Sequence, residues 1–448
     1  MKKTFALTAL FAALSLGSCN KEYLNPSTVS LPQVVSSSDG LITLCNGLQY
    51  RYSTNGLLSV LYNTVAAGGL STRELLVLNQ GNTEENNVSV GGSSLDNING
   101  IVRNLWTQSH LVKANADLVL ANASNAPDAA TRNGIVAYAS IFRALAIGTL
   151  AQYFQQLPLA VQDNAPFVDR VVALRNAVAQ LETAAAQVAA LPVSAEFNSK
   201  IVAGIDLPNT MQALIARYSL EAGDYDKALA AAGRVDLTKR SVFNFDESPL
   251  TRNAIFVTAF GNRNLFEPFN ASLGLTGALA PEAGDRRLPF YIRTTPPPPP
   301  PAAQPNLGIG FYTANSAPIP VYVPGEMLLI RAEAYARKGD LANAVIELDK
   351  VRTSTAAATV NSNGLPTAPA GAGLAAYAGP VTSADVLLDI LRNRNVELAF
   401  QGFRLSDSRR FGRPGPGAAG AERNRNFFPY PRVERENNSQ TPPLPDPQ

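Results

Sequence analysis

The stretch ALIARYSLEAGDYDKAL at residues 213–229 recurs in outline as LIRAEAYARKGDLANAV at residues 329–345. When the Gly-Asp pairs at 223–224 and 339–340 are superposed, small residues also coincide, Ala216 with Ala332 and Ala228 with Ala344. This pattern is typical of a tetratricopeptide-like helix pair, in which two helices touch at alanines and a glycine lies in the turn. Because such hairpins bury their faces by stacking on neighbours, the two copies predict a mainly α-helical repeat scaffold.

Helical spacing of apolar and alanine residues extends to both sides of the two copies. It predicts helices at 105–122, 134–154, 168–191, 209–235, 324–353 and 383–403, with Ser383 capping the last. Strand-like alternation is confined to short pieces such as 319–323. The segments 79–104, 237–320, 356–381, 413–426 and 434–448 are predicted to be loops, and the prolines 296–301 to form a stiff rod.

The N-terminus carries the pattern of a bacterial lipoprotein signal. Lys2 and Lys3 precede an apolar run from 5 to 16, and Leu-Gly-Ser then leads into Cys19. This pattern predicts cleavage before Cys19, diacylation of its thiol and a polar tether over 20–26. The alternative is an ordinary signal peptide in which the cysteine has no role. Later apolar runs are expected to be too short to span a membrane.

Charge and cysteine usage exclude several classes of function. Of the 37 basic residues, two lie in the signal, and the remaining 35 equal the acidic residues in number, so we expect no nucleic-acid partner. With Cys19 acylated, Cys45 has no disulfide partner, and stability must come from a packed core. A single histidine, His110, and one free thiol are too few for a zinc site, and we expect no metal or other cofactor.

The composition shifts along the chain predict its division into segments. A signal peptide at 1–18 is followed by an anchored tether and N-terminal segment at 19–45. Helical repeats over 46–236 and over 321–448, the latter with the tail, flank an irregular, loop-rich insertion at 237–320.

A series of motifs in a fixed order resembles a known family. The motifs are YLNP at 23–26, Trp106 with KANADLVL at 113–120, FRA at 142–144, LAQYF at 150–154, DRRL at 285–288, VPGEMLLIRAEA at 323–334, RNVELAFQGFR at 394–404, DSRRFG at 407–412 and FPYP at 428–431. Together they resemble the SusD/RagB family of outer-membrane nutrient-binding lipoproteins of Bacteroidota over most of the chain. The resemblance implies four tetratricopeptide-like helix pairs, a superhelix that carries an irregular subdomain.

The same resemblance implies a function without catalysis. Such a protein faces the cell exterior, captures oligosaccharides and sits as a lid on a SusC-like, TonB-dependent transporter. Capture of peptides is the alternative within the family, and a lid that binds no ligand is a third possibility. The chain departs from the family pattern at Asn393 and Gln401, where acidic residues are usual, and Trp106 is its only tryptophan.

Two regions supply candidate ligand-binding side chains. The loop 79–104 offers amide and carboxylate groups for sugar hydroxyls, and the irregular insertion offers aromatic rings for stacking. The candidate residues are Arg73, Asn82, Glu84, Asn86, Tyr291, Phe311 and Tyr312. The competing interpretation is that the loop is simply solvated and that the aromatic rings are buried.

No residue is assigned a catalytic role. The charges from Arg394 to Arg410 are spaced to form ion pairs along helices, Arg394 with Glu397 and Arg404 with Asp407. A rival hypothesis is a surface glycoside hydrolase that would use carboxylates among Glu84, Glu85 and Asp96.

Overall fold

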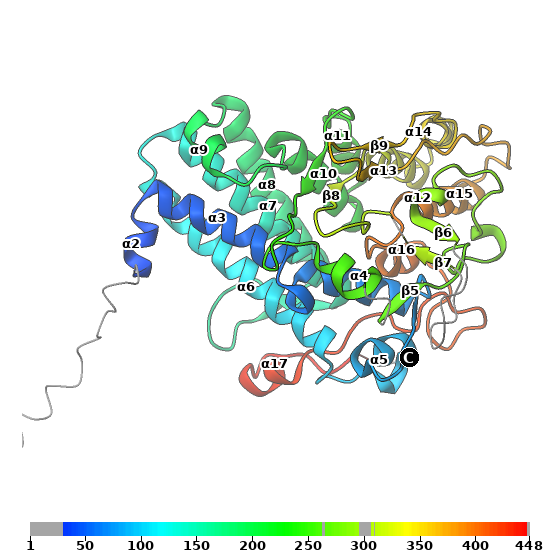
Figure 1. Cartoon of the computed structure of the whole chain (residues 1–448), viewed down its shortest axis with the longest axis horizontal. Coiled ribbons are helices and arrows are strands. Elements are labelled where there is room, and N and C mark those ends of the chain that lie inside the picture. Colours follow the sequence, from blue (N-terminus) through cyan, green and yellow to red (C-terminus); the bar gives the residue numbers. More distant parts are fainter. Residues whose placement is uncertain (1–29, 262–264, 295–305, 309, 446–448) are drawn as a thin grey trace, which may run out of the picture.

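The computed structural model describes residues 30–261, 265–294, 306–308 and 310–445. The predicted signal and anchor at 1–19, the tether 20–26 and the prolines 296–301 lie outside the described residues. Within these ranges the protein is mainly helical, as the repeat pattern predicts, and Figure 1 shows the helices stacked from α3 to α15 with the irregular segments on one side.

The scaffold is built from ten helices. They are α3 (Ser38–Ser53), α4 (Val60–Ser71), α6 (Gly100–Asn122), α7 (Ala129–Tyr153), α8 (Arg170–Ala190), α10 (Leu207–Glu221), α11 (Tyr225–Ala232), α13 (Pro324–Arg337), α14 (Leu341–Arg352) and α15 (Ser383–Glu397). Shorter helices connect or cover them, namely α2 (Leu31–Val35), α5 (Thr83–Val90), α9 (Ala195–Lys200), α12 (Leu288–Tyr291), α16 (Arg404–Arg410) and α17 (Arg432–Asn437), with single turns η1 (Gly56–Leu58), η2 (Gly92–Ser94), η3 (Ala123–Asn125), η4 (Phe256–Phe260) and η5 (Gly277–Leu279).

The described strands form five antiparallel pairs and no larger sheet. The pairs are β1 (Leu75–Val77) with β5 (Phe266–Pro268), β2 (Gln156–Pro158) with β3 (Phe167–Asp169), β4 (Ser241–Phe243) with β8 (Ile319–Tyr322), β6 (Ile292–Thr294) with β7 (Asn306–Gly308), and β9 (Thr359–Val360) with β10 (Pro366–Ala368). Each pair joins distant loops to the scaffold; β1 with β5, for instance, ties the segment after α4 to the irregular insertion.

The two predicted helix pairs are confirmed. Gly223 and Gly339 turn the chain between α10 and α11 and between α13 and α14, both in the left-handed region at φ 80° and 84°. The four superposed alanines are fully buried at the contacts between the helices. The pairs stack in sequence, α8 on α10 and α11 on α13, which is the arrangement of a helical repeat.

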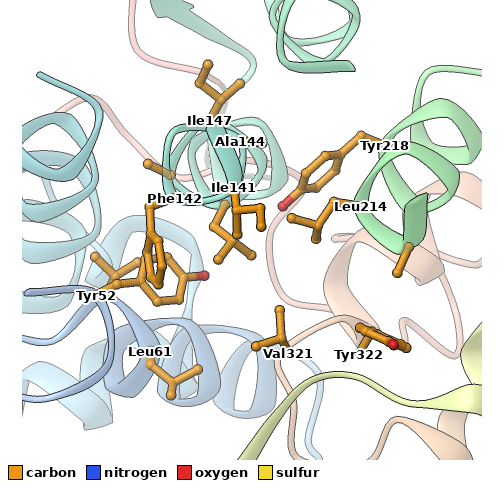
Figure 2. Packing of buried hydrophobic residues seen from close by; sticks show 14 of the residues in the cluster. Tyr52, Leu61, Ile141, Phe142, Ala144, Ile147, Leu214, Tyr218, Val321 and Tyr322 are labelled. Atoms are coloured by element: carbon orange, nitrogen blue, oxygen red, sulfur yellow. The ribbon is translucent and has the colours of Figure 1, made fainter. Parts of the chain in front are cut away.

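Helix α7 lies at the centre of the scaffold. It is the one described helix long and apolar enough to cross a membrane, contrary to our expectation that no such run follows the signal, but 89 % of that stretch is buried inside the protein. Figure 2 shows side chains of α7 meeting Tyr52, Leu214 and Tyr218. A Cβ on Gly148 would lie 2.3 Å from the Tyr218 ring, so glycine is what allows α10 to approach α7 this closely.

Several boundaries differ from the sequence-based expectation. The cap of α15 is Thr382 instead of Ser383, because the Thr382 hydroxyl accepts the hydrogen bond from the amide of Asp385. The loop predicted over 79–104 contains α5, and the predicted tail contains most of α17. Helix α5 has two carboxylates in its first turn, which favours a helix N-terminus even in an Asn-rich segment.

The predicted ion pairs along helices are wrong in their partners. Arg394 on α15 pairs with Asp407 on α16, and Glu397 pairs with Arg287 at 3.1 Å. Arg404 pairs with Glu74, which follows α4, at 3.0 Å. These ion pairs therefore hold separate segments together. Whether an arginine pairs with a nearby or a distant carboxylate depends on which one is buried beside it, and spacing in the sequence does not reveal this.

Candidate functional site

Two adjoining hollows open on the side of the scaffold where α4, α15 and α16 meet the loops. The first has a volume of about 380 Å³ and the second about 450 Å³, and both lie within the roughly 300–1,000 Å³ typical of small-molecule sites. They share Arg73, Ala421 and Glu422. We call the two hollows together the Arg73 cleft.

The walls of the Arg73 cleft come from distant parts of the sequence. The first hollow is lined by Thr72, Arg73, Gly274, Leu275, Thr276, Leu279, Leu391, Asn395, Arg404, Ser408, Ala418, Gly420, Ala421 and Glu422. The second adds the end of α5 and the loop before α17, with Ser71, Ser89, Val90, Gly92, Pro416, Gly417, Arg423 and Asn424. Most of these side chains are small or polar, and none of the described residues that line the cleft is aromatic.

Arg73 is held in an unusual backbone conformation. It follows the end of α4 with φ 57°, in the left-handed region that non-glycine residues seldom adopt. The loop opposite presses on its backbone, since a Cβ on Gly274 would lie 1.8 Å from the Arg73 carbonyl oxygen. Asn270 Oδ1 fixes that loop by accepting hydrogen bonds from the amides of Ser272 and Gly274. Strained residues of this kind often mark functional positions.

The charge of Arg73 is not neutralised within the protein. Its side chain is exposed, and no described residue forms an ion pair or hydrogen bond with its guanidinium. Glu422, the one acidic residue among the described residues that line the cleft, is itself engaged by Arg413 at 2.7 Å. Arg73 is therefore an available cation at the junction of the two hollows.

Arg404 lines the first hollow and is 8 % exposed. Its Nη1 donates to the Leu273 carbonyl at 2.5 Å, and its Nη2 lies 3.0 Å from Glu74 Oε1. Both Nε and Nη2 are sealed from solvent, and Nε has no hydrogen-bond partner among the described residues. Burial lowers the pKa of Arg404 and raises that of Glu74, while the attraction between the two charges opposes both shifts.

The turn before α16 sets the position of Arg404. Phe400 adopts φ 61°, its amide donates to Glu74 Oε1 at 3.0 Å, and its carbonyl accepts from the Tyr312 hydroxyl at 2.6 Å. Gly402 then passes so close to α4 that a Cβ would lie 2.6 Å from the Thr64 carbonyl oxygen. These contacts leave the start of α16 little freedom to move.

Of the seven candidate ligand residues, Arg73 is the one that lines the cleft. Asn82, Glu84 and Asn86 lie at the start of α5, whose other end borders the second hollow. Glu84 Oε2 accepts the first amide of α6, from Gly100, at 2.5 Å, which is a helix-capping role. The spacing of Asn82 and Glu85 is that of a capping box and is a signal for α5 that the loop prediction passed over.

The three candidate aromatic residues lie in the interior. Tyr291 and Phe311 are at most 1 % exposed and pack against Phe290. Tyr312 is 2 % exposed and donates to the Phe400 carbonyl, as described above. No ring of the three offers a face to a surface ligand in this arrangement, which corresponds to the competing interpretation of these residues as buried.

The carboxylates considered for hydrolysis are engaged elsewhere. Glu85 is buried and its Oε1 accepts the Tyr62 hydroxyl at 2.9 Å, and Asp96 Oδ1 accepts the Ile98 amide at 3.1 Å. None of Glu84, Glu85 and Asp96 lines the cleft.

A separate, smaller hollow lies between α7, α10 and the turn before α16. Its volume of about 60 Å³ corresponds to about two water molecules, so it is too small for a sugar or peptide. Gln401, one of the two departures from the family pattern, lines it, and the Nε2 of Gln401 has no described hydrogen-bond partner. The other departure, Asn393, accepts a hydrogen bond from Arg287 at 2.9 Å.

Comparisons with known proteins agree with this architecture. Residues 309–444 match the sequence model of the SusD family. No protein of curated function matches the sequence. A SusD superfamily protein from Bacteroides vulgatus has 15 % identity and a TM-score of 0.67, with 91 % of this chain and 98 % of that one covered.

Two further solved structures have the same fold. A SusD-like carbohydrate-binding protein from Bacteroides vulgatus has 17 % identity and a TM-score of 0.68, covering 90 % of this chain and 97 % of its own. The NanU protein of B. fragilis has 13 % identity and a TM-score of 0.67, covering 95 % of this chain and 100 % of its own.

Proposed function

We propose that this protein, which resembles the SusD family in sequence over 309–444 and solved SusD superfamily structures in fold, is a surface nutrient-binding protein without catalytic activity. It captures an oligosaccharide in the Arg73 cleft and delivers it to a SusC-like, TonB-dependent transporter in the outer membrane. Acylation of Cys19 holds it on the membrane, facing the cell exterior.

The observation that carries this proposal is the Arg73 cleft itself. It is large enough for a small ligand, it is lined mainly by small and polar groups, and it exposes an arginine without an internal partner. Unpaired donors that converge on an open hollow are the usual elements of a ligand site on a preformed scaffold.

Hydrolysis receives less support than binding. A glycoside hydrolase needs two carboxyl groups about 5 to 9.5 Å apart across the scissile bond. Among the described residues that line the cleft, Glu422 supplies the one carboxylate, and Arg413 binds it.

Peptide capture is the second candidate. Sugar binding commonly stacks a ring face on an aromatic side chain, and the described residues that line the cleft include no aromatic one. Recognition here would therefore depend on hydrogen bonds and charge, which suit a peptide as well as a hydroxyl-rich sugar.

A combined array and pull-down tests the proposal. The full chain, purified in detergent, is applied to glycan and peptide arrays, and a tagged chain is used to capture its partner from outer membranes. We expect saturable binding to at least one array ligand, without any product, and co-purification of a transporter. If a transporter co-purifies but no ligand on either array binds, the protein acts as a lid that captures nothing. If an array ligand is cleaved and a product is released, the hydrolase hypothesis is favoured.

A further inference from the structure

We propose that the ligand captured in the Arg73 cleft carries a carboxylate, which the exposed guanidinium of Arg73 binds together with the side-chain amide of Asn395. This inference rests on the proposed capture function and specifies its ligand class. Two sources share the chemistry, an acidic oligosaccharide with uronic acid units and a peptide with a free carboxyl group.

The balance of charge in the cleft differs from that of the whole chain. The sequence has 37 basic and 35 acidic residues. Among the described residues that line the cleft, however, three arginines, Arg73, Arg404 and Arg423, face a single acidic residue, Glu422. Because Arg413 already neutralises Glu422 and Glu74 pairs with Arg404, the charges left for a ligand are those of Arg73 and Arg423. Arg423 is held by hydrogen bonds to Asn426, Ser408 and the Arg413 carbonyl, whereas the side chain of Arg73 is exposed. A positively charged hollow favours an anionic ligand.

Asn395 provides an independent observation. It is 6 % exposed, it lines the first hollow, and no described residue forms a hydrogen bond with its side-chain amide. Buried polar groups are nearly always hydrogen-bonded, and the atoms of this amide are not sealed from the hollow, so its hydrogen-bonding capacity is available to a group bound there.

Arg404 also lines this hollow, but it belongs to the wall of the hollow. Its Nη2 forms the ion pair with Glu74 at 3.0 Å, and its Nε and Nη2 are sealed from solvent. A guanidinium group binds a carboxylate through two parallel hydrogen bonds, and an amide can donate to the same oxygens. Arg73, which follows α4, and Asn395 on α15 border one hollow and can supply these two groups.

The test uses matched ligands that differ only in charge. The probes are a galacturonic acid trimer and its methyl ester, and a tripeptide with a free carboxyl terminus and its amide. Binding to the full chain is measured by calorimetry at low and high salt. We expect an acid form to bind at least about tenfold more tightly than its neutral counterpart, with the difference shrinking at high salt.

Three variants test which residues cause the preference for the acid form of the ligand. Arg73→Asn suits the left-handed backbone and removes the charge, and it is expected to weaken binding of the acid about tenfold, to the level of the neutral form. Asn395→Leu is expected to weaken binding without lowering the melting temperature, because the amide has no partner within the fold. Arg234→Ala, an exposed arginine beyond the cleft, is the control and is expected to change neither.

The outcomes separate this inference from the proposed function. The inference is wrong, while capture stands, if array ligands bind but the acid and neutral forms of a ligand bind equally tightly. It is also wrong if Arg73→Asn leaves the affinity for the acid unchanged. If no ligand of any kind binds, capture itself fails and the inference fails with it. The two acid pairs tell which source supplies the carboxylate.

Discussion

The guanidinium of Arg394 and the carboxylate of Asp407 form a buried two-point ion pair between α15 and α16. Arg394 Nε and Nη2 lie 3.0 and 3.1 Å from the two carboxylate oxygens, and both side chains are at most 4 % exposed. Arg410 contacts the same carboxylate at 2.6 Å. Burial alone would raise the pKa of Asp407, but the two arginines outweigh it and the pKa is lowered.

We expect Asp407→Asn to destabilise the protein by about 3 kcal/mol or more, because two buried arginines lose their counter-charge. The midpoint of urea denaturation measures the effect. Glu436→Gln breaks the exposed pair with Arg432 on α17 and serves as the control, with no measurable change expected. Equal midpoints for Asp407→Asn and the unmodified chain would show that this pair does not hold α15 to α16.

Close packing of α10 on α7 gives a second prediction. Gly148→Ala improves intrinsic helix propensity by up to about 1 kcal/mol, but its methyl group would overlap the Tyr218 ring. We expect a net destabilisation of about 1–3 kcal/mol, partly relieved by Tyr218→Leu in the double variant. The control is Gly47→Ala in α3, where a Cβ meets nothing within 4 Å, and it should stabilise the protein. A stabilising Gly148→Ala would contradict the packing argument.

The only histidine predicts a dependence of stability on pH. Burial, assisted by Lys113, lowers the pKa of His110 to about 3, whereas in the unfolded chain it is near 6.5. As pH falls below about 6.5, His110 becomes protonated in the unfolded chain but stays neutral in the folded protein. The free energy of unfolding therefore decreases by up to about 1.4 kcal/mol per pH unit.

Between pH 7 and pH 5 we therefore expect a loss of up to about 2 kcal/mol that His110→Phe abolishes. Unfolding can be followed by the fluorescence of Trp106, whose ring lies 4.6 Å from that of His110. The comparison of the two proteins isolates His110 from the carboxyl groups, which both share. A parallel pH dependence in the two proteins would assign the loss to other groups.

The sequence predicts the features of this protein that depend on local spacing. The helix pairs could be read from Gly223 and Gly339 with their alanines, because a period near 3.6 and a turn glycine are local properties. The ion-pair partner of Arg394 could not be predicted from the sequence, because Glu397 lies three residues on and Asp407 lies on the next helix. Burial decides in favour of Asp407.

Of the described residues that line the cleft, Arg73 is the one that the sequence predicted as a ligand-binding residue. Glu422 lines the same cleft as Arg73 but is far from it in sequence, and the loop 413–426 that carries Glu422 has no periodic pattern. Likewise, Tyr291 and Tyr312 could have been exposed platforms or core residues by composition alone. Their hydroxyl groups bond to the Glu397 and Phe400 carbonyls, and such tertiary contacts leave no trace in the residues nearby.

The two cysteines predict how the protein is held on the membrane. If Cys19 is acylated, Cys19→Ser should abolish incorporation of labelled palmitate and move the protein from the membrane pellet to the soluble fraction, because two or three acyl chains anchor far more firmly than one. Cys45→Ala is the matched control. Cys45 is fully buried in α3 and burial raises the pKa of its thiol, so acylation there is not expected and the variant should stay labelled. Label that survives in Cys19→Ser would contradict the anchor.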